Sequence, residues 1–210
     1  MAIARLALAS GVLLIASACS SASTPATTST DFTTKPDVAI SNDGGSLEGH
    51  TPTAFPGTGT GLFAGDNLNA SFPEGVGVHM YLTFALPSAL SVGGARITSD
   101  ALQVAGSPFE DLGPLLVEPV AYESFAPEVF DLPSIGSATE CRVVDNTSIE
   151  CDVTSAVQTA VDRGEDTAQF RIRFTRLADN DGKQDLAMFF RSDSNSNEAG
   201  LFMLTIEFGS

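Results

Sequence analysis

Residues 78–86 read VHMYLTFAL, and every second side chain in this stretch is apolar. A period of two is that of a β-strand, whose successive side chains point to opposite faces of a sheet. We therefore expect a strand with one face in a hydrophobic core and with His79, Tyr81 and Thr83 on the opposite face. The core face would carry Val78, Met80, Leu82, Phe84 and Leu86.

Two further stretches repeat this pattern. In QFRIRFTRL, residues 169–177, the side chains of Arg171 and Arg173 alternate with an apolar set, and LFMLTIEF, residues 201–208, alternates in the same way. Gly, Pro, Asn and Asp lie between these stretches, and these residue types are typical of the connections between strands. The inward-facing residues would be Phe170, Ile172, Phe174, Phe202, Leu204, Ile206 and Phe208. Weaker strand candidates lie at 96–104, 113–120, 142–144, 148–153 and 186–191.

One segment has a helical period instead. In DVTSAVQTAVDRG, residues 152–164, one helical face carries Val153, Val157, Ala160 and Val161. Asp152 or Thr154 can accept N–H groups of the first turn, and Gly164 offers a C-terminal stop. Eight to ten short strands with a single helix predict an all-β fold, an antiparallel β-sandwich or jelly roll with one short α-helix.

The N-terminal region has the layout of an export signal. Residues 1–18 place Arg5 before an apolar stretch that is shorter than the roughly 20 residues of a membrane span, which favours a cleaved signal peptide. Ala16-Ser17-Ala18-Cys19 resembles the lipobox of bacterial lipoproteins, which implies a fatty-acylated (palmitate-carrying) Cys19 at the mature N-terminus. The alternative is a plain secreted protein. Ser20 resembles the sorting residue for outer-membrane lipoproteins of Gram-negative bacteria.

A linker follows the lipidated cysteine. From Ser20 to Thr30 every residue is Ser, Thr, Ala or Pro, a composition without apolar surface to bury, which is typical of a disordered tether. We expect residues 19–36 to form this linker and residues 37–210 to form one domain, held outside the cytoplasm as a monomer on a lipid-anchored chain. This localisation is a prediction from the signal alone.

The two remaining cysteines form an even pair in an oxidising compartment. They read CRVVDNTSIEC, and a hairpin turn centred on Asn146 would place Val143 opposite Ile149 and Cys141 opposite Cys151. Opposed residues of an antiparallel pair lie within the distance that a disulfide bridges. We therefore expect a Cys141–Cys151 disulfide. It would stabilise the fold by at most roughly 3 kcal/mol, because the loop it closes is short.

The charge balance excludes one class of partner. The chain has 26 acidic and 10 basic residues, a formal net charge of −16. Such a surface repels phosphate backbones, so we expect no nucleic-acid partner.

An acidic loop is a candidate cation site. Asp179, Asp181 and Asp185 surround Gly182, and hard oxygen ligands on a turn suit Ca²⁺. The EF-hand spacing fails, because Leu177 and Met188 would stand at the first and twelfth ligand positions. An irregular calcium loop and an ordinary polar turn both remain open. No other cofactor is expected.

The outward residues of two strands are the candidate ligand contacts. Tyr81 beside His79 could offer a stacking surface, and Arg171 and Arg173, with Arg191, could face an anionic polysaccharide. The alternative is an ordinary structural role for each residue. The chain has no Trp and two Tyr, which weakens an aromatic sugar platform.

The sequence has no recognisable catalytic signature. We find no GxSxG elbow, HExxH, P-loop or GxGxxG, and the only histidines are His50 and His79. We expect a non-catalytic protein, with a hydrolase as a further alternative.

The order of several segments resembles one family. YLTFALPSAL, ARITSDALQV, CDVTSAVQTAVDRG, FRIRF and MFFRSDSNSNEAGLFMLTIEF together resemble the DNRLRE domain, an extracellular bacterial β-sandwich related to carbohydrate-binding modules. The resemblance covers residues 76–208. It implies a sandwich that binds glycan or mediates adhesion at the cell envelope. The alternative is a structural component that contacts another envelope protein through a sandwich face.

Overall fold

The computed structural model describes most of the predicted domain. The described residues are 29–33, 35–41, 47–49, 61–69, 72–86, 91–124, 127–190 and 201–208. The predicted signal peptide, Cys19, His50 and Arg191 lie outside them. No helix among these described ranges is long and apolar enough to cross a membrane.

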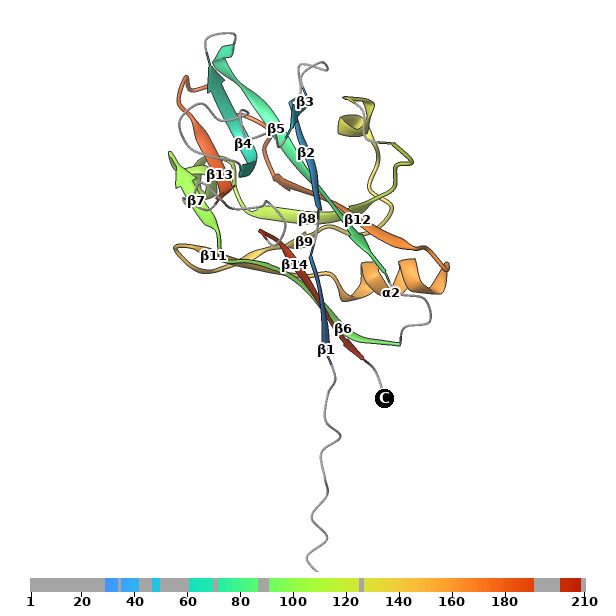
Figure 1. Cartoon of the computed structure of the whole chain (residues 1–210). Helices are drawn as coiled ribbons and strands as arrows, with labels where there is room; N and C mark the ends of the chain where they lie inside the picture. The colour runs from blue at the N-terminus through green and yellow to red at the C-terminus, as the bar shows by residue number, and fades with distance from the viewer. Residues whose placement is uncertain are drawn as a thin grey trace, which may run out of the picture.

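The described residues form two antiparallel sheets (Figure 1). The five-stranded sheet has the order β1-β14-β6-β11-β10, and the nine-stranded sheet has the order β7-β13-β4-β5-β12-β8-β9, with β2 and β3 attached to it through β5. The strands are β1 Ser29–Thr33, β2 Lys35–Ser41, β3 Leu47–Gly49, β4 Gly61–Asn69, β5 Phe72–Ala85, β6 Val92–Ser99, β7 Leu102–Ala105, β8 Leu115–Val120, β9 Thr139–Glu140, β10 Arg142–Asp145, β11 Ser148–Asp152, β12 Thr167–Phe174, β13 Asp185–Phe190 and β14 Met203–Phe208. The helices are α1 Pro108–Asp111, α2 Thr154–Asp162 and a 3₁₀ turn η1 Pro127–Asp131.

The main core lies between the two sheets. Met80, Leu82 and Phe84 of β5 pack in one cluster with residues of β12, such as Phe170, and with Leu204 and other residues of β14. The period-two patterns of these three strands therefore predicted the buried face, and the all-β sandwich is confirmed. Two of the predicted inward residues are exceptions: Val78 is buried in a separate cluster with Phe63 and Leu186, and Phe208 is only partly buried at the end of β14.

Two boundaries differ from expectation. The single strand expected at 96–104 is divided: β6 ends at Ser99 in the five-stranded sheet and β7 begins at Leu102 in the nine-stranded sheet. The Ser99 hydroxyl accepts the N–H of Ala101 at 3.3 Å within this turn. Near the N-terminus, β1 pairs with β14 inside the stretch that we assigned to the linker. Backbone pairing needs no apolar side chains, so composition alone did not reveal this strand.

The predicted helix forms as α2. Asp152 Oδ1 accepts the N–H of Thr154 at 2.9 Å, which satisfies one free donor of the first turn. Gly164 has φ of +69°, and the N–H groups of Gly164 and Glu165 return to the carbonyls of Val161 and Ala160. This is the left-handed C-terminal stop that glycine favours.

One short segment joins the edges of both sheets. β9 pairs with β8 in the nine-stranded sheet, and β10 pairs with β11 in the five-stranded sheet, so the chain crosses between the sheets at Cys141. Cys141 is disulfide-bonded to Cys151, with a Cα–Cα distance of 4.3 Å. Val143 lies opposite Ile149, as predicted. The disulfide prediction is confirmed, and the bond holds the point at which the two sheets meet.

Candidate functional site

The outer face of the nine-stranded sheet carries a small core of its own. Tyr81, Val120 and Val129 are buried together, with Tyr122, Phe130 and Leu132 packed against them. Val129, Phe130 and Leu132 come from the segment 127–135, which contains η1. Its end is tied to β8, because Ile135 N–H and the Ser134 hydroxyl both donate to the carbonyl of Pro119. The sheet face that we expected to be open is therefore covered here.

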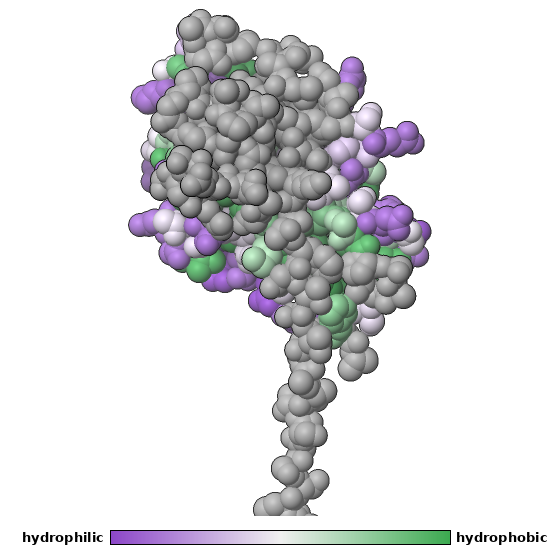
Figure 2. Space-filling view, viewed as in Figure 1, coloured by the Kyte–Doolittle hydropathy of each residue, from purple (hydrophilic) through white to green (hydrophobic). Residues whose placement is uncertain are grey.

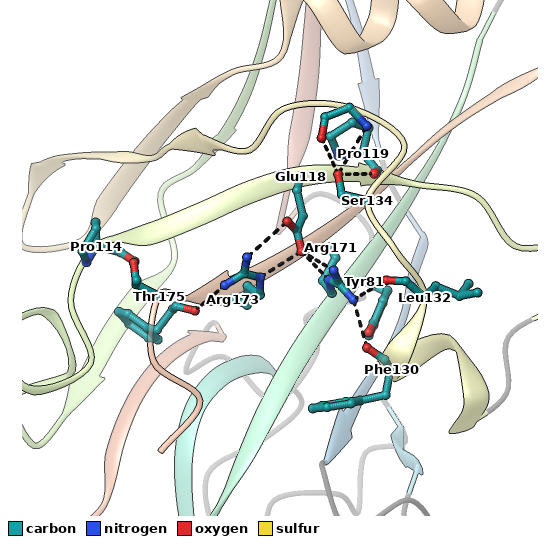
Figure 3. A network of polar contacts seen from close by, with 12 residues as sticks. Tyr81, Pro114, Glu118, Pro119, Phe130, Leu132, Ser134, Arg171, Arg173 and Thr175 are labelled. Atoms are coloured by element: carbon teal, nitrogen blue, oxygen red, sulfur yellow. Dashed lines mark hydrogen bonds and ion pairs between the residues drawn. The ribbon is translucent and has the colours of Figure 1, made fainter. Parts of the chain in front are cut away.

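An ion-pair network lies beneath this segment (Figure 3). Glu118, 3% exposed, accepts hydrogen bonds from Arg171 Nε at 2.5 Å and from Arg173 Nε at 2.8 Å. Arg171 Nη1 also donates to the carbonyls of Phe130 and Leu132, each at 2.9 Å. Burial alone would raise the pKa of Glu118, but the hydrogen bonds from Arg173 and Arg171 outweigh it and hold that pKa below its ordinary value.

Tyr81 and His79 belong to the same covered face. The Tyr81 hydroxyl donates to the Val129 carbonyl at 3.2 Å, and burial raises the pKa of Tyr81 to about 12. The His79 ring stacks on Phe130 with 4.0 Å between ring centroids. Burial, with the nearby charges of Arg171 and Arg173, lowers the pKa of His79 to about 3, so the imidazole is neutral at physiological pH.

The structure thus brings the four predicted ligand contacts together, but not at an open surface. His79, Tyr81 and Arg171 are buried, and Arg173 is partly buried against Glu118. The polar groups of Tyr81, Arg171 and Arg173 bind the segment 127–135 and Glu118 rather than solvent. His79 contributes only its ring, because its Nδ1 atom is buried without a hydrogen-bond partner in the described part of the chain. Glu118 was not foreseen, because its strand partner Arg171 is 53 residues away along the chain.

A groove opens on the other side of β8 and β12, beneath α2. It has a volume of about 540 Å³, within the range of small-ligand sites. Its floor is apolar and includes Val117 and Phe170, and its rim is formed by α2 and by residues 135–139. Figure 2, drawn from the same side as Figure 1, shows hydrophobic and hydrophilic residues next to one another around α2 and β6. The polar lining residues are Ser137, Thr139, Asp152, Thr154, Ser155, Gln158, Thr159, Arg163, Glu165 and Gln169.

The charged groups of the groove are few and mixed in sign. Arg163 lies 3.7 Å from Glu165 in an exposed pair, and Asp152 adds one further carboxylate. The backbone and hydroxyl hydrogen bonds from Thr154 hold the pKa of Asp152 below its usual range, so this carboxylate is ionised at neutral pH. The lining therefore carries one positive and two negative charges and disfavours an anionic ligand.

The structure brings together two of the three predicted loop carboxylates, with a third from another element. Asp179 and Asp185 each place a carboxylate oxygen near one of Asp111, with the three oxygens within 4.8 Å of one another. Asp181 instead accepts a hydrogen bond from Lys183 Nζ at 2.5 Å on the exposed side of the loop. Asp111, in α1, was missed because it lies 68 residues before Asp179 in the chain and no short spacing connects the two.

Comparisons with known proteins place the chain in no family: no protein-family model matches it, and no curated protein matches it either.

Proposed function

We propose that this chain is a non-catalytic, lipid-anchored binding module of the bacterial cell envelope, and that the groove beneath α2 takes a neutral glycan. The anchoring part rests on the signal-like residues 1–18 and on the lipobox-like residues before Cys19. The resemblance to DNRLRE domains supports a glycan ligand. The observation that carries the proposal is the groove itself, with hydroxyl and amide side chains around an apolar floor.

The chemistry of the groove fits a sugar chain. Sugars present hydroxyl groups at their edges and C–H groups on their faces, so a polar rim and an apolar floor complement both. Ser155, Gln158 and Thr159 project from consecutive turns of one helix and line the groove together. A ligand lying along α2 would meet these groups in succession. The mixed charges favour a neutral polymer over an anionic polysaccharide, which the sequence offered as one possible ligand of the outward arginines.

A glycan array with the mature chain tests this function. We expect binding to neutral glycans, and we expect Ser155→Trp, which places a large ring at the groove, to abolish it. Arg163→Ala should weaken binding at least several-fold without changing stability, because its exposed pair with Glu165 contributes little.

Arg142→Ala is the matched control, since Arg142 also forms an exposed ion pair, with Glu150 at 3.3 Å, and does not line the groove. A blank array with folded protein, or equal effects of Arg163→Ala and Arg142→Ala, would reject the proposal.

A structural role in which the domain contacts another envelope protein is the second candidate. Val143 and Val144 are 41% and 49% exposed on β10, the last strand of the five-stranded sheet. Exposed apolar residues on an edge strand suit pairing with a strand of another chain. Val143→Lys with Val144→Lys should then remove capture of that partner and leave glycan binding unchanged.

A further inference from the structure

Two buried aspartates face each other across neighbouring strands. Asp66 of β4 and Asp185 of β13 are direct partners in the antiparallel register, and they are 0% and 2% exposed. Like charges at opposed positions repel, and an ionised carboxylate without a counter-charge is costly to bury. A pair of this kind therefore requires an explanation in the surrounding structure.

The hydrogen bonds of the protein satisfy only half of this pair. Asp185 Oδ1 accepts the N–H of Ser107 at 2.6 Å, and Asp66 Oδ2 accepts the N–H of Asp179 at 3.3 Å. The other oxygen of each carboxylate, Asp66 Oδ1 and Asp185 Oδ2, is buried without a hydrogen-bond partner in the described part of the chain. Buried polar atoms in native proteins are nearly always paired, so two such oxygens together indicate a ligand.

Two more carboxylates converge on Asp185. Asp111 at the end of α1 and Asp179 in the loop before β13 complete a set of three whose oxygens lie within 4.8 Å of one another. Ca²⁺ binds oxygen ligands at 2.3–2.6 Å, so opposite ligands in its coordination sphere lie about 5 Å apart. The three oxygens can therefore belong to a single sphere, with Asp66 beside it on β4.

No side chain in the described ranges neutralises this charge through an ion pair. Lys183 interacts with the charges of Asp111 and Asp179 only at longer range, because its side chain is 77% exposed and donates to Asp181. Both carboxylates also lie against glycine backbones: a Cβ atom on Gly75 would lie 2.1 Å from Asp66 Oδ1, and one on Gly106 would lie 2.3 Å from Asp185 Oδ1.

We propose that Asp66, Asp111, Asp179 and Asp185 bind a Ca²⁺ ion, which ties α1 and the loop 175–184 to the edge of the nine-stranded sheet. Calcium is favoured over magnesium because the ligands are several carboxylates from separate segments, partly buried, whereas Mg²⁺ retains most of its water. This proposal is independent of the groove beneath α2, which lies elsewhere on the fold and shares none of these residues.

Thermal unfolding of the mature chain, after chelation and with added Ca²⁺ or Mg²⁺, tests the site. At a 100-fold excess over Kd we expect Ca²⁺ to raise the Tm by about 5 °C or more, and Mg²⁺ to raise it clearly less. Isothermal titration should give one Ca²⁺ per chain. The absence of any Ca²⁺-dependent shift in chelated, folded protein would overturn the proposal.

Asp179→Asn and Asp181→Asn form a matched pair of variants from one loop. Asp179→Asn should reduce Ca²⁺ affinity at least tenfold, whereas Asp181→Asn should retain it, because Asp181 is bound to Lys183. Asp66→Asn should lose Ca²⁺ binding yet unfold at a higher temperature than the chelated wild type, because it removes a buried charge. Equal effects of Asp179→Asn and Asp181→Asn would contradict the assignment.

Discussion

At the scale of single residues, Glu118 is the centre of the covered outer face. It binds two arginines, and one of these, Arg171, is only 8% exposed. A buried ion pair contributes less than its contacts suggest, because both groups are desolvated, yet removing one partner leaves an uncompensated buried charge. The main effect of the network is therefore to fix the position of the segment 127–135, and its contribution to net stability is smaller.

Removing the charge of Glu118 should consequently destabilise the folded protein strongly. Glu118→Gln should lower the free energy of unfolding by about 3 kcal/mol or more, because Arg171 stays buried without its counter-ion. Glu207→Gln is the control, since Glu207 pairs with Arg96 at the exposed surface and should change stability by less than about 1 kcal/mol. Urea unfolding measures both, and similar losses for the two variants would contradict this description of the network.

His79 should make the protein acid-sensitive. Its pKa is about 3 in the folded chain and near 6.5 when unfolded, so the unfolded state binds a proton first as the pH falls. The stability that depends on neutral His79 is complete above about pH 6.5 and should fall by about 2.5 to 3 kcal/mol by pH 4.5.

His79→Phe should remove that part of the pH dependence, because Phe keeps the stacking on Phe130 and cannot be protonated. The acidic groups are the same in both proteins, so the difference between the two stability curves isolates His79. Parallel curves from pH 7 to 4.5 would show that His79 is not buried in the neutral form.

The individual site residues were only partly predictable. Asp179 and Asp185 were found because they lie in one acidic loop, but Asp66 and Asp111 reach the same place from β4 and α1. Only the strand register brings Asp66 opposite Asp185. A single sequence contains no signal for such a long-range pairing.

At the scale of elements, the alternating patterns of β5, β12 and β14 predicted both the strands and their buried faces. The same patterns could not show what covers the opposite face. Alternation with a period of two distinguishes the two faces of a strand. It does not show that the segment 127–135 packs on the outer face and buries residues such as Tyr81, which we expected at the surface. The groove beneath α2 was also not foreseen, because it depends on how the helix packs against β6 and β12.

The hairpin of β10 and β11 allows a test of the disulfide. Cys141 and Cys151 are 4% and 0% exposed, and their bond closes a short loop at the meeting point of the two sheets. Cys141→Ala with Cys151→Ala should lower the free energy of unfolding by at most roughly 3 kcal/mol and leave the chain folded. Circular dichroism with urea titration checks this. Complete unfolding of the double variant would show that the bond is essential to the sandwich.

At the scale of the whole molecule, strands from the two ends of the described chain lie together. β1 pairs with β14 in the five-stranded sheet, and Figure 1 shows the C-terminal end of β14 beside β1. A linker before β1 would therefore leave the domain beside the C-terminal end of β14. In the proposed lipoprotein, this arrangement joins the anchor to a sheet edge rather than to the groove beneath α2.

The most direct test of the central claim is an NMR titration of the mature, isotope-labelled chain with the glycan that binds best on the array. If the groove beneath α2 is the binding site, the amide signals of residues 153–163 and 135–139 should shift together and saturate with one Kd. The account is contradicted if those signals stay fixed while signals of residues 127–134 or of β10 move.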